Sequence, residues 1–241
     1  MPLTPPVTRR EALGLIAVTA TGGAFLAREA LAQSNSLLAA SPMLMPDAGV
    51  CTIIPRASEG PFYFDPGLER QDITEGKQGV ALTVRLQAVD ASCRPLRGAR
   101  VDIWHCDAEG QYSGYPGQGD GGDVDTTGEK FLRGVQRTDA DGIASFKTIY
   151  PGWYRGRTTH IHFKVFPNEN SVLTGQFYFL DSLSEDLYAS QPPYRNRVAK
   201  RDTFNDGDRH ARRAGRSAQA TLREKLPAYE ALLVVAVDPN S

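Results

Sequence analysis

VALTVRLQAV, residues 80–89, is the clearest strand pattern in the chain, because its apolar residues alternate with polar or small ones. A period of two is typical of a strand with one buried face. Five further short runs rich in branched and aromatic residues, separated by Gly, Pro, Asp and Asn, lie at 101–106, 143–149, 160–166, 175–180 and 232–237. No helix pattern of comparable strength lies between them. The sequence therefore predicts an all-β fold, a β-sandwich of two sheets with long loops.

Two connecting segments carry separate expectations. The turn signal DADG, residues 139–142, lies between residues 135–138 and the run at 143–149, which predicts a β-hairpin. Residues 182–226 are polar and irregular, and they predict a long surface excursion, either a solvated loop or a short helix. This excursion carries a basic cluster that could bind an anionic partner: Arg209, Arg212, Arg213 and Arg216.

Composition and charge exclude several classes of protein. The chain of 241 residues has 27 Lys+Arg against 28 Asp+Glu, which gives a formal net charge of -1. That balance offers no electrostatic footprint for a polyphosphate, so nucleic acid is not an expected partner. The chain has no repeat of fixed period, which excludes a solenoid or a coiled coil.

The N-terminus has the three parts of an export signal. Residues 9–10, both Arg, precede an uncharged apolar stretch at 13–27 and the small-x-small sequence Ala-Leu-Ala at 30–32. The paired arginines resemble a twin-arginine signal, with Ala12 where that signal usually has Phe or Leu. We expect cleavage after Ala32, export to the periplasm or the medium by the twin-arginine route, and no stable membrane span after processing. The chain thus divides into a signal and a single domain: 1–32 and 33–241.

The three cysteines differ in their settings. Cys51 and Cys93 lie in turn-like segments, and in an oxidising compartment they could form a disulfide. Cys106 lies inside an apolar run and is expected to be a small buried core residue.

Two of the four histidines, His160 and His162, stand two residues apart on a predicted strand and therefore on one face. Their Cα atoms would be about 6–7 Å apart, so both imidazoles could reach one ion, while Ile161 and Phe163 point to the buried face. The pattern is compatible with a metal site and equally with two histidines on a polar strand face. His105, on another predicted strand, is expected to be a satisfied core histidine.

The remaining ligands of such a metal site must come from elsewhere in the chain. A cupin would need an acid four or five residues after the second histidine, where Phe166 and Pro167 stand. A facial-triad iron site would need an H-x-D/E unit, and a zinc site would need clustered thiolates; the sequence has neither. Tyr112 and Tyr154 are the notable oxygen donors nearby, although each taken by itself is more often a core or rim aromatic with a satisfied hydroxyl. Since a phenol with a pKa of about 10 ionises only beside a strongly Lewis-acidic cation, two phenolates favour a hard trivalent metal.

Several motifs occur in order along the chain: Glu59-Gly60-Pro61-Phe62-Tyr63, residues 101–108 leading to Tyr112, Phe131-Leu132-Arg133-Gly134, and residues 151–154 leading to His160 and His162. Together they resemble the intradiol ring-cleavage dioxygenases over about residues 51–206. The likeness is to the catalytic part of the protocatechuate 3,4-dioxygenase type. The helical N-terminal dimerisation region of the cytosolic catechol enzymes has no counterpart in this sequence.

The resemblance implies a metal centre and a reaction. It implies that a non-haem Fe(III) ion is bound by four ligands: Tyr112, Tyr154, His160 and His162. It implies a small aromatic diol as substrate and O2 as co-substrate, with intradiol cleavage of a catechol-type ring to a cis,cis-muconate-type diacid that contains both oxygen atoms. In the family, one tyrosinate leaves the metal and helps to take up a proton, and position matching gives that role to Tyr154.

The resemblance also implies roles around the metal. Arg157 matches an arginine placed near the ring, where a fixed guanidinium could stabilise developing negative charge. Gln176 matches a glutamine behind the ligands, and its alternative is an outward-facing strand residue. The segment Gly60-Pro61-Phe62 could line the slot for the aromatic ring, or it could be an ordinary turn.

Two alternatives to an enzyme of this family remain open. One is a non-catalytic, metal-containing β-sandwich module that binds an aromatic or carbohydrate ligand. The other is a copper or zinc His-x-His protein, which would have no tyrosinate-to-iron charge-transfer colour. A homo-oligomer is compatible with the sequence in each case.

Overall fold

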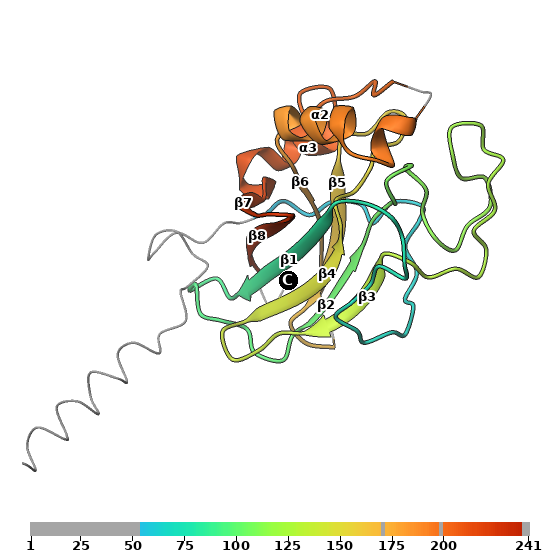
Figure 1. Cartoon of the computed structure of the whole chain (residues 1–241). Helices are drawn as coiled ribbons and strands as arrows, with labels where there is room; N and C mark the ends of the chain where they lie inside the picture. Colours follow the sequence, from blue (N-terminus) through green and yellow to red (C-terminus); the bar gives the residue numbers. More distant parts are fainter. Residues whose placement is uncertain (1–53, 170–171, 198–199, 238–241) are drawn as a thin grey trace, which may run out of the picture. The chain divides into compact units, whose positions relative to one another are not determined.

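The computed structural model describes residues 54–169, 172–197 and 200–237. Its strands form two four-stranded sheets (Figure 1). The first sheet has the order β4-β1-β8-β7, with bounds Ile143–Ile149, Ala81–Val89, Ala228–Ala236 and Thr221–Lys225. The second has the order β3-β2-β5-β6, with bounds Arg133–Arg137, Arg100–Trp104, His160–Phe166 and Leu173–Tyr178. The predicted signal and Cys51, and with it the Cys51–Cys93 pairing, lie outside the described residues.

The core lies between the two sheets, as the alternating strand patterns predict. In β1 the buried face carries Leu82, Val84 and Leu86, and in β5 it carries Ile161 and Phe163. All five belong to one hydrophobic cluster, and burying each such side chain contributes roughly 1.5–3 kcal/mol. The predicted two-sheet β-sandwich is therefore confirmed. One pairing, β1 with β8, is parallel, and the other pairings between these strands are antiparallel.

The predicted hairpin at residues 139–142 is wrong, although the turn itself forms. Gly142 N donates to Asp139 O at 3.1 Å, and Asp139 N donates to Ile143 O at 3.0 Å. The strands on either side then separate, because β3 pairs with β2 while β4 pairs with β1. An Asp-Gly turn fixes a local reversal of the chain but not the partner of each strand, so here it links the two sheets.

The polar excursion at 182–226 is more ordered than the sequence suggested. It contains two α-helices, two short 3-10 helices and an edge strand: α2 (Asp181–Ser190), η1 (Tyr194–Asn196), α3 (Arg209–Ala214), η2 (Gly215–Ala218) and β7. The helix α2 buries Ser184, Leu187 and Tyr188, which share one helical face, and Tyr194 also joins the core. None of the helices in the described ranges is long and apolar enough to cross a membrane.

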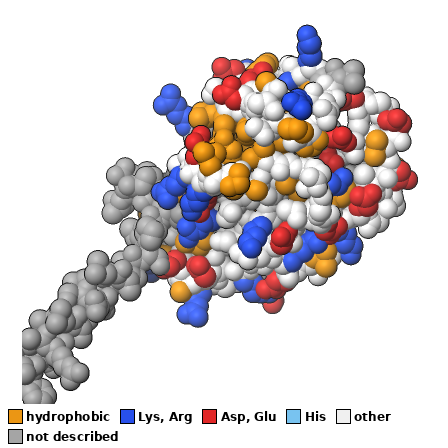
Figure 2. Space-filling model, in the orientation of Figure 1, with side chains coloured by type: hydrophobic (Ala, Val, Ile, Leu, Met, Phe, Trp, Pro, Cys, Tyr) orange, Lys and Arg blue, Asp and Glu red, His pale blue; other side chains and the backbone are white. Residues whose placement is uncertain are grey.

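Two long loops cover the second sheet on the side away from the core. They connect β2 to β3 and β4 to β5, and Figure 1 shows the first of them extending beside the sheets. Beneath them Trp104, Cys106 and Tyr112 form a separate buried cluster against Phe62 and Tyr154. On the face seen in Figure 2, acidic and basic side chains are interspersed. The loop-covered face of the second sheet is where the candidate site lies.

Candidate metal centre

His160 and His162 lie on the loop-covered face of β5, because the residues between and after them point into the core. Their Nε2 atoms face each other at 3.1 Å. Both side chains are buried, with exposed fractions of 2% and 3%. The prediction that the two imidazoles share one face is confirmed.

Tyr112 and Tyr154 bring phenol oxygens to the same place. Tyr112 lies in the loop after β2, and Tyr154 lies in the loop between β4 and β5. Their Oη atoms are 3.4 Å and 3.2 Å from the Nε2 atom of His160. Four donor atoms from three separate segments therefore surround one position.

Burial keeps both imidazoles neutral. Desolvation, together with the positive charge of Arg157, lowers the pKa of His160 to about 3. Burial and the neighbouring His160 lower the pKa of His162 well below 6.5. His160 Nδ1 lies 2.6 Å from the carbonyl oxygen of Thr158, so Nδ1 donates and Nε2 keeps its lone pair. The neutral imidazole is the form that binds a metal.

Burial shifts the pKa values of the two phenols upward, in the opposite direction to those of the histidines. Desolvation raises the pKa of Tyr154 to about 12, although the charge of Arg157 opposes this rise. Desolvation, with a contribution from Tyr154, raises the pKa of Tyr112 well above 10. Without a cation, both hydroxyls keep their protons at neutral pH.

The donor set fits one hard metal ion. Ligand atoms bound about 2.0–2.1 Å from a metal lie roughly 3 Å from one another, as these do. Within the described ranges no group of three or more His, Cys, Asp and Glu side chains could hold a metal, so the oxygen donors would be the tyrosines. Two phenols that ionise only beside a strong Lewis acid suit a trivalent cation better than zinc.

Arg157 is fixed next to this donor set by three different partners. Its Nε atom donates to Asp208 Oδ2 at 2.7 Å, and one terminal nitrogen donates to Tyr154 Oη at 3.3 Å. The other terminal nitrogen donates to Gln176 Oε1. Gln176 is therefore a buried partner of Arg157, with 2% of its surface exposed, and not an outward strand residue.

Asp208 is a site residue that the sequence analysis did not identify. Its carboxylate also accepts from the backbone of Thr158 and caps the N-terminus of α3 through the backbone of His210 and Ala211. Asp208 follows an Asn-Asp-Gly sequence, so the sequence alone indicates one more turn residue. No local signal links it to Arg157, which is 51 positions away.

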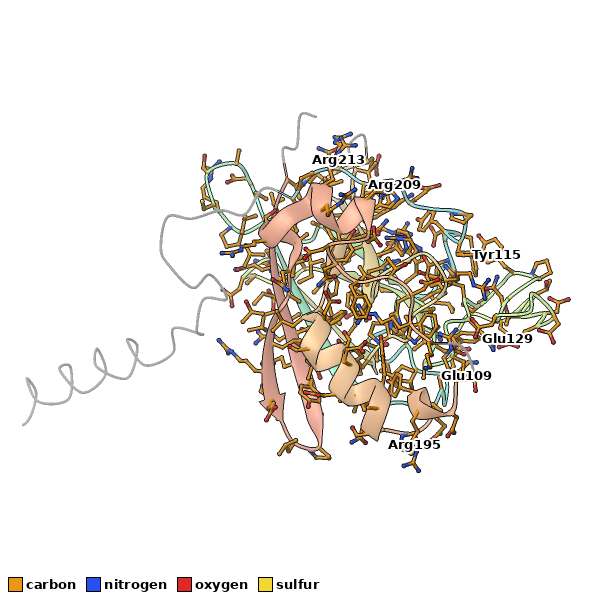
Figure 3. The ribbon with its side chains drawn as sticks, turned by 90° about the horizontal axis from the view of Figure 1, so that it is seen from above. Glu109, Tyr115, Glu129, Arg195, Arg209 and Arg213 are labelled. Atoms are coloured by element: carbon orange, nitrogen blue, oxygen red, sulfur yellow. The ribbon has the colours of Figure 1, made fainter. Side chains whose placement is uncertain are left out.

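The segment Gly60-Pro61-Phe62 lies against the donor cluster. The Phe62 ring stacks on Tyr112, with ring centres 4.7 Å apart, and a Cβ atom on Gly60 would lie 3.5 Å from His162 Cε1. Pro61 is exposed. Phe62 and Tyr154 line a cavity of about 250 Å³ with the loop after β2, whose Glu109 stands at the edge of the molecule in Figure 3. Tyr154 is therefore reachable from this cavity.

His105 and Cys106 are structural, as predicted. His105 is fully buried, and its two ring nitrogens lie 2.8 Å from Cys106 O and 2.7 Å from Thr148 Oγ1. Cys106 is a buried free thiol. Cys106 packs with Trp104 and Tyr112, whereas His105 points to Thr148 of β4, a strand of the first sheet.

Trp104 orients His162 in place of a hydrogen bond. The two residues are directly paired between β2 and β5, and their rings stack with centres 4.8 Å apart and planes at 15°. Among the described residues, His162 Nδ1 has no hydrogen-bond partner, whereas His160 Nδ1 has Thr158. A metal-binding imidazole needs a neighbour to hold its orientation. For His162 that neighbour is the indole ring of Trp104.

Replacing Trp104 should therefore loosen the metal. Trp104→Leu is expected to weaken metal affinity by about 10–100-fold, as loss of an orienting neighbour typically does. Trp104→Phe, which keeps a stacking ring, should lose less. The measurement is competition with a chelator, and Phe177→Leu is the control, because it removes a buried ring from the core between the sheets. Equal affinities in the two leucine variants would contradict the role given to Trp104.

Comparison with known proteins agrees with the fold and the motifs. A family model described as Dioxygenase matches residues 58–213. An intradiol ring-cleavage dioxygenase from Tetranychus urticae superposes with a TM-score of 0.72 and 32% identity, covering 79% of this chain and 96% of that one. Catechol 1,2-dioxygenase 1 of Acinetobacter lwoffii is 28% identical over an alignment of 146 residues, which covers 51% of this chain and 45% of that protein. The protocatechuate 3,4-dioxygenase beta chain of Burkholderia cepacia is 31% identical over 125 residues, 48% of this chain and 52% of that one.

Fold and site together define a β-sandwich in which two histidines of β5 and two tyrosines of the covering loops meet on one face of the second sheet. The chain belongs to the intradiol ring-cleavage dioxygenase family. The matched region spans about half the length of the curated relatives.

Proposed function

We propose that this chain holds a non-haem ferric ion through Tyr112, Tyr154, His160 and His162, and uses O2 to cleave a catechol-type ring between its two hydroxyls. The observation that carries the proposal is the convergence of three donors within 3.4 Å of His160 Nε2. A structural metal site would have no need of two buried phenols beside two neutral imidazoles. The product would be a cis,cis-muconate-type diacid containing both oxygen atoms.

The protonation states of the donors support the choice of metal. When bound, a ferric ion would supply a strong Lewis acid that makes an aromatic diol reactive toward O2. Tyr112 and Tyr154 would give up their protons only to such a cation, since burial raises the pKa of both hydroxyls.

We propose that Tyr154 is the residue that takes up a proton from the substrate. It is less buried than Tyr112, it lines the cavity described above, and its Oη atom accepts from Arg157. A diol entering along the cavity would meet Tyr154, and the phenolate of Tyr154, formed once its hydroxyl has given up its proton, could take up a proton from the diol. Arg157 would then stabilise negative charge that develops next to Tyr154, because Asp208 and Gln176 prevent it from turning away.

A visible absorption spectrum of the iron-loaded protein tests this function. A broad tyrosinate-to-iron charge-transfer band is expected, and anaerobic addition of catechol should move it to longer wavelength. The Tyr112→Phe variant should lose a large part of the band. A colourless protein that holds stoichiometric zinc or copper would contradict the proposal and favour the non-catalytic alternative.

A further inference from the structure

A small hairpin in the loop after β2, residues 118–124, forms one wall of the cavity that Tyr154 lines. Gln118 N donates to Val124 O at 2.8 Å, and Val124 N donates to Gln118 O at 3.1 Å. Residues 117–120 line the cavity, whereas residues 121–123 are exposed. Figure 3 shows Tyr115, three residues before the hairpin, in the part of the chain that extends from the sheets. Hairpin 118–124 therefore has one side on the cavity and the other on solvent.

The base of hairpin 118–124 is anchored to the backbone of Tyr112. The buried Gln118 accepts through Oε1 from Tyr112 N at 2.9 Å. Thr126, just after the hairpin, donates from Oγ1 to Tyr112 O at 2.7 Å. Both polar groups of the Tyr112 backbone are thus held by the segment that carries the hairpin. We therefore expect the base to stay in place when the tip moves.

The tip of hairpin 118–124 is held by an ion pair with a residue far away in the sequence. Arg197 donates from a terminal nitrogen to Asp120 Oδ1 at 2.5 Å, across 77 positions. Three of the four residues 119–122 are glycines, which have no side chain to hold a turn and more backbone freedom than other residues. Among the described residues, Asp123 forms no ion pair. The position of the tip therefore depends on the Asp120–Arg197 pair.

Arg197 is a fixed anchor for this pair. Its guanidinium lies over the Trp153 ring, 3.8 Å from the ring centre, and also donates to the Trp153 carbonyl oxygen. The Arg197 side chain has an exposed fraction of 5%. A Cβ atom on Gly110 would lie 2.9 Å from Arg197 Nη1, so a glycine is needed to leave room for the guanidinium. Since Trp153 directly precedes Tyr154, Asp120 is tied to the segment that carries a metal donor.

The cavity beside the hairpin is small. Its volume of about 250 Å³ is below the roughly 300–1,000 Å³ that is typical of pockets for drug-sized ligands. Two of its other walls are braced, because Phe62 stacks on Tyr112 and Tyr154 accepts from Arg157. A cavity of this size suits a one-ring molecule, and we expect a second ring to require movement of a wall. The wall that can move at the cost of one ion pair is the tip of hairpin 118–124.

We propose that Asp120 and Arg197 determine the size of the substrate. Their ion pair holds the tip of hairpin 118–124 against the cavity, and it thereby favours a one-ring diol over a diol that carries a second ring. This specificity role rests on the proposed function. The restraint on the hairpin does not, because it requires neither metal nor turnover.

Hydrogen exchange of the metal-free protein tests the restraint. In Asp120→Ala the amides of Gln118 and Val124 should exchange at least about fivefold faster than in the wild type, because the tip opens more often. Arg197→Met, which keeps a long side chain over Trp153 but cannot pair with Asp120, should show the same change. Asp123→Ala is the matched control, since it removes a carboxylate from the same hairpin but no ion pair, and it should exchange as the wild type does. Equal exchange in the two alanine variants would overturn the restraint.

Turnover by the iron-loaded protein tests the specificity. The wild type should have a higher kcat/KM for catechol than for 4-phenylcatechol, and Asp120→Ala should lower this preference by about tenfold. Asp120→Glu keeps the carboxylate and should lose less of the preference, and Asp123→Ala should lose none. A purely structural role would instead lower kcat/KM for both diols in the same proportion.

The two measurements together separate the possible failures. If Asp120→Ala speeds up hydrogen exchange but leaves the preference between the diols unchanged, the pair only holds the hairpin, and the specificity role is wrong. If no diol is turned over while the exchange result holds, the proposed function fails and size selection fails with it, whereas the restraint on hairpin 118–124 stands.

Discussion

The His162→Ala variant should lose its metal. His162 Nε2 lies 3.1 Å from His160 Nε2, and alanine leaves that side of the cluster without a donor atom. Loss of a residue that only supports a ligand already weakens binding about 10–100-fold, so loss of a ligand should weaken it by at least about 100-fold. Metal analysis after dialysis against a chelator should give near-stoichiometric iron in the wild type and almost none in the variant.

His210→Ala provides the matched control for this experiment. It also removes a histidine, but His210 lies on α3 and its side chain is outside the donor cluster. This variant should retain iron as the wild type does. If His162→Ala and His210→Ala retained iron equally, the assignment of the donor cluster would be wrong. The metal-free variants should have similar melting temperatures, which separates loss of a ligand from loss of the fold.

The histidine pair illustrates what could be predicted from the sequence. A period of two places His160 and His162 on one face of a strand whatever the strand pairs with. The alternation along residues 80–89 likewise predicts a half-buried strand without knowledge of its partner. Both predictions depend on local geometry alone, and the structure confirms both.

Contacts between distant segments could not be predicted in this way. The turn at 139–142 forms as expected, yet it connects two sheets, because the pairing of β3 and β4 is decided by β2 and β1. Asp208 lies in a stretch with the composition of a loop, and only the folded chain brings it to Arg157. The burial of α2 depends on three residues at helical spacing within a polar sequence, a weak signal without the sheet beneath it.

The Arg157→Ala variant should keep its iron and lose turnover. Arg157 donates to Tyr154 Oη but is not among the four donor atoms, so metal stoichiometry should stay close to that of the wild type. Its guanidinium is held by Asp208 and Gln176 in one orientation, and removing such a fixed donor typically lowers kcat by about 10²–10³. The loss should appear in kcat at saturating diol, because the charge acts beside the reacting groups.

Arg157→Lys separates positioning from charge. A lysine keeps the positive charge but has one nitrogen, which cannot reach Asp208, Gln176 and Tyr154 together. Its kcat should therefore fall between those of the alanine variant and the wild type. In both variants the charge-transfer band should shift, since Tyr154 loses its donor and, in the alanine variant, a charge that holds its pKa down. Wild-type turnover in Arg157→Ala would show that this guanidinium is only a structural link between α3 and the loop before β5.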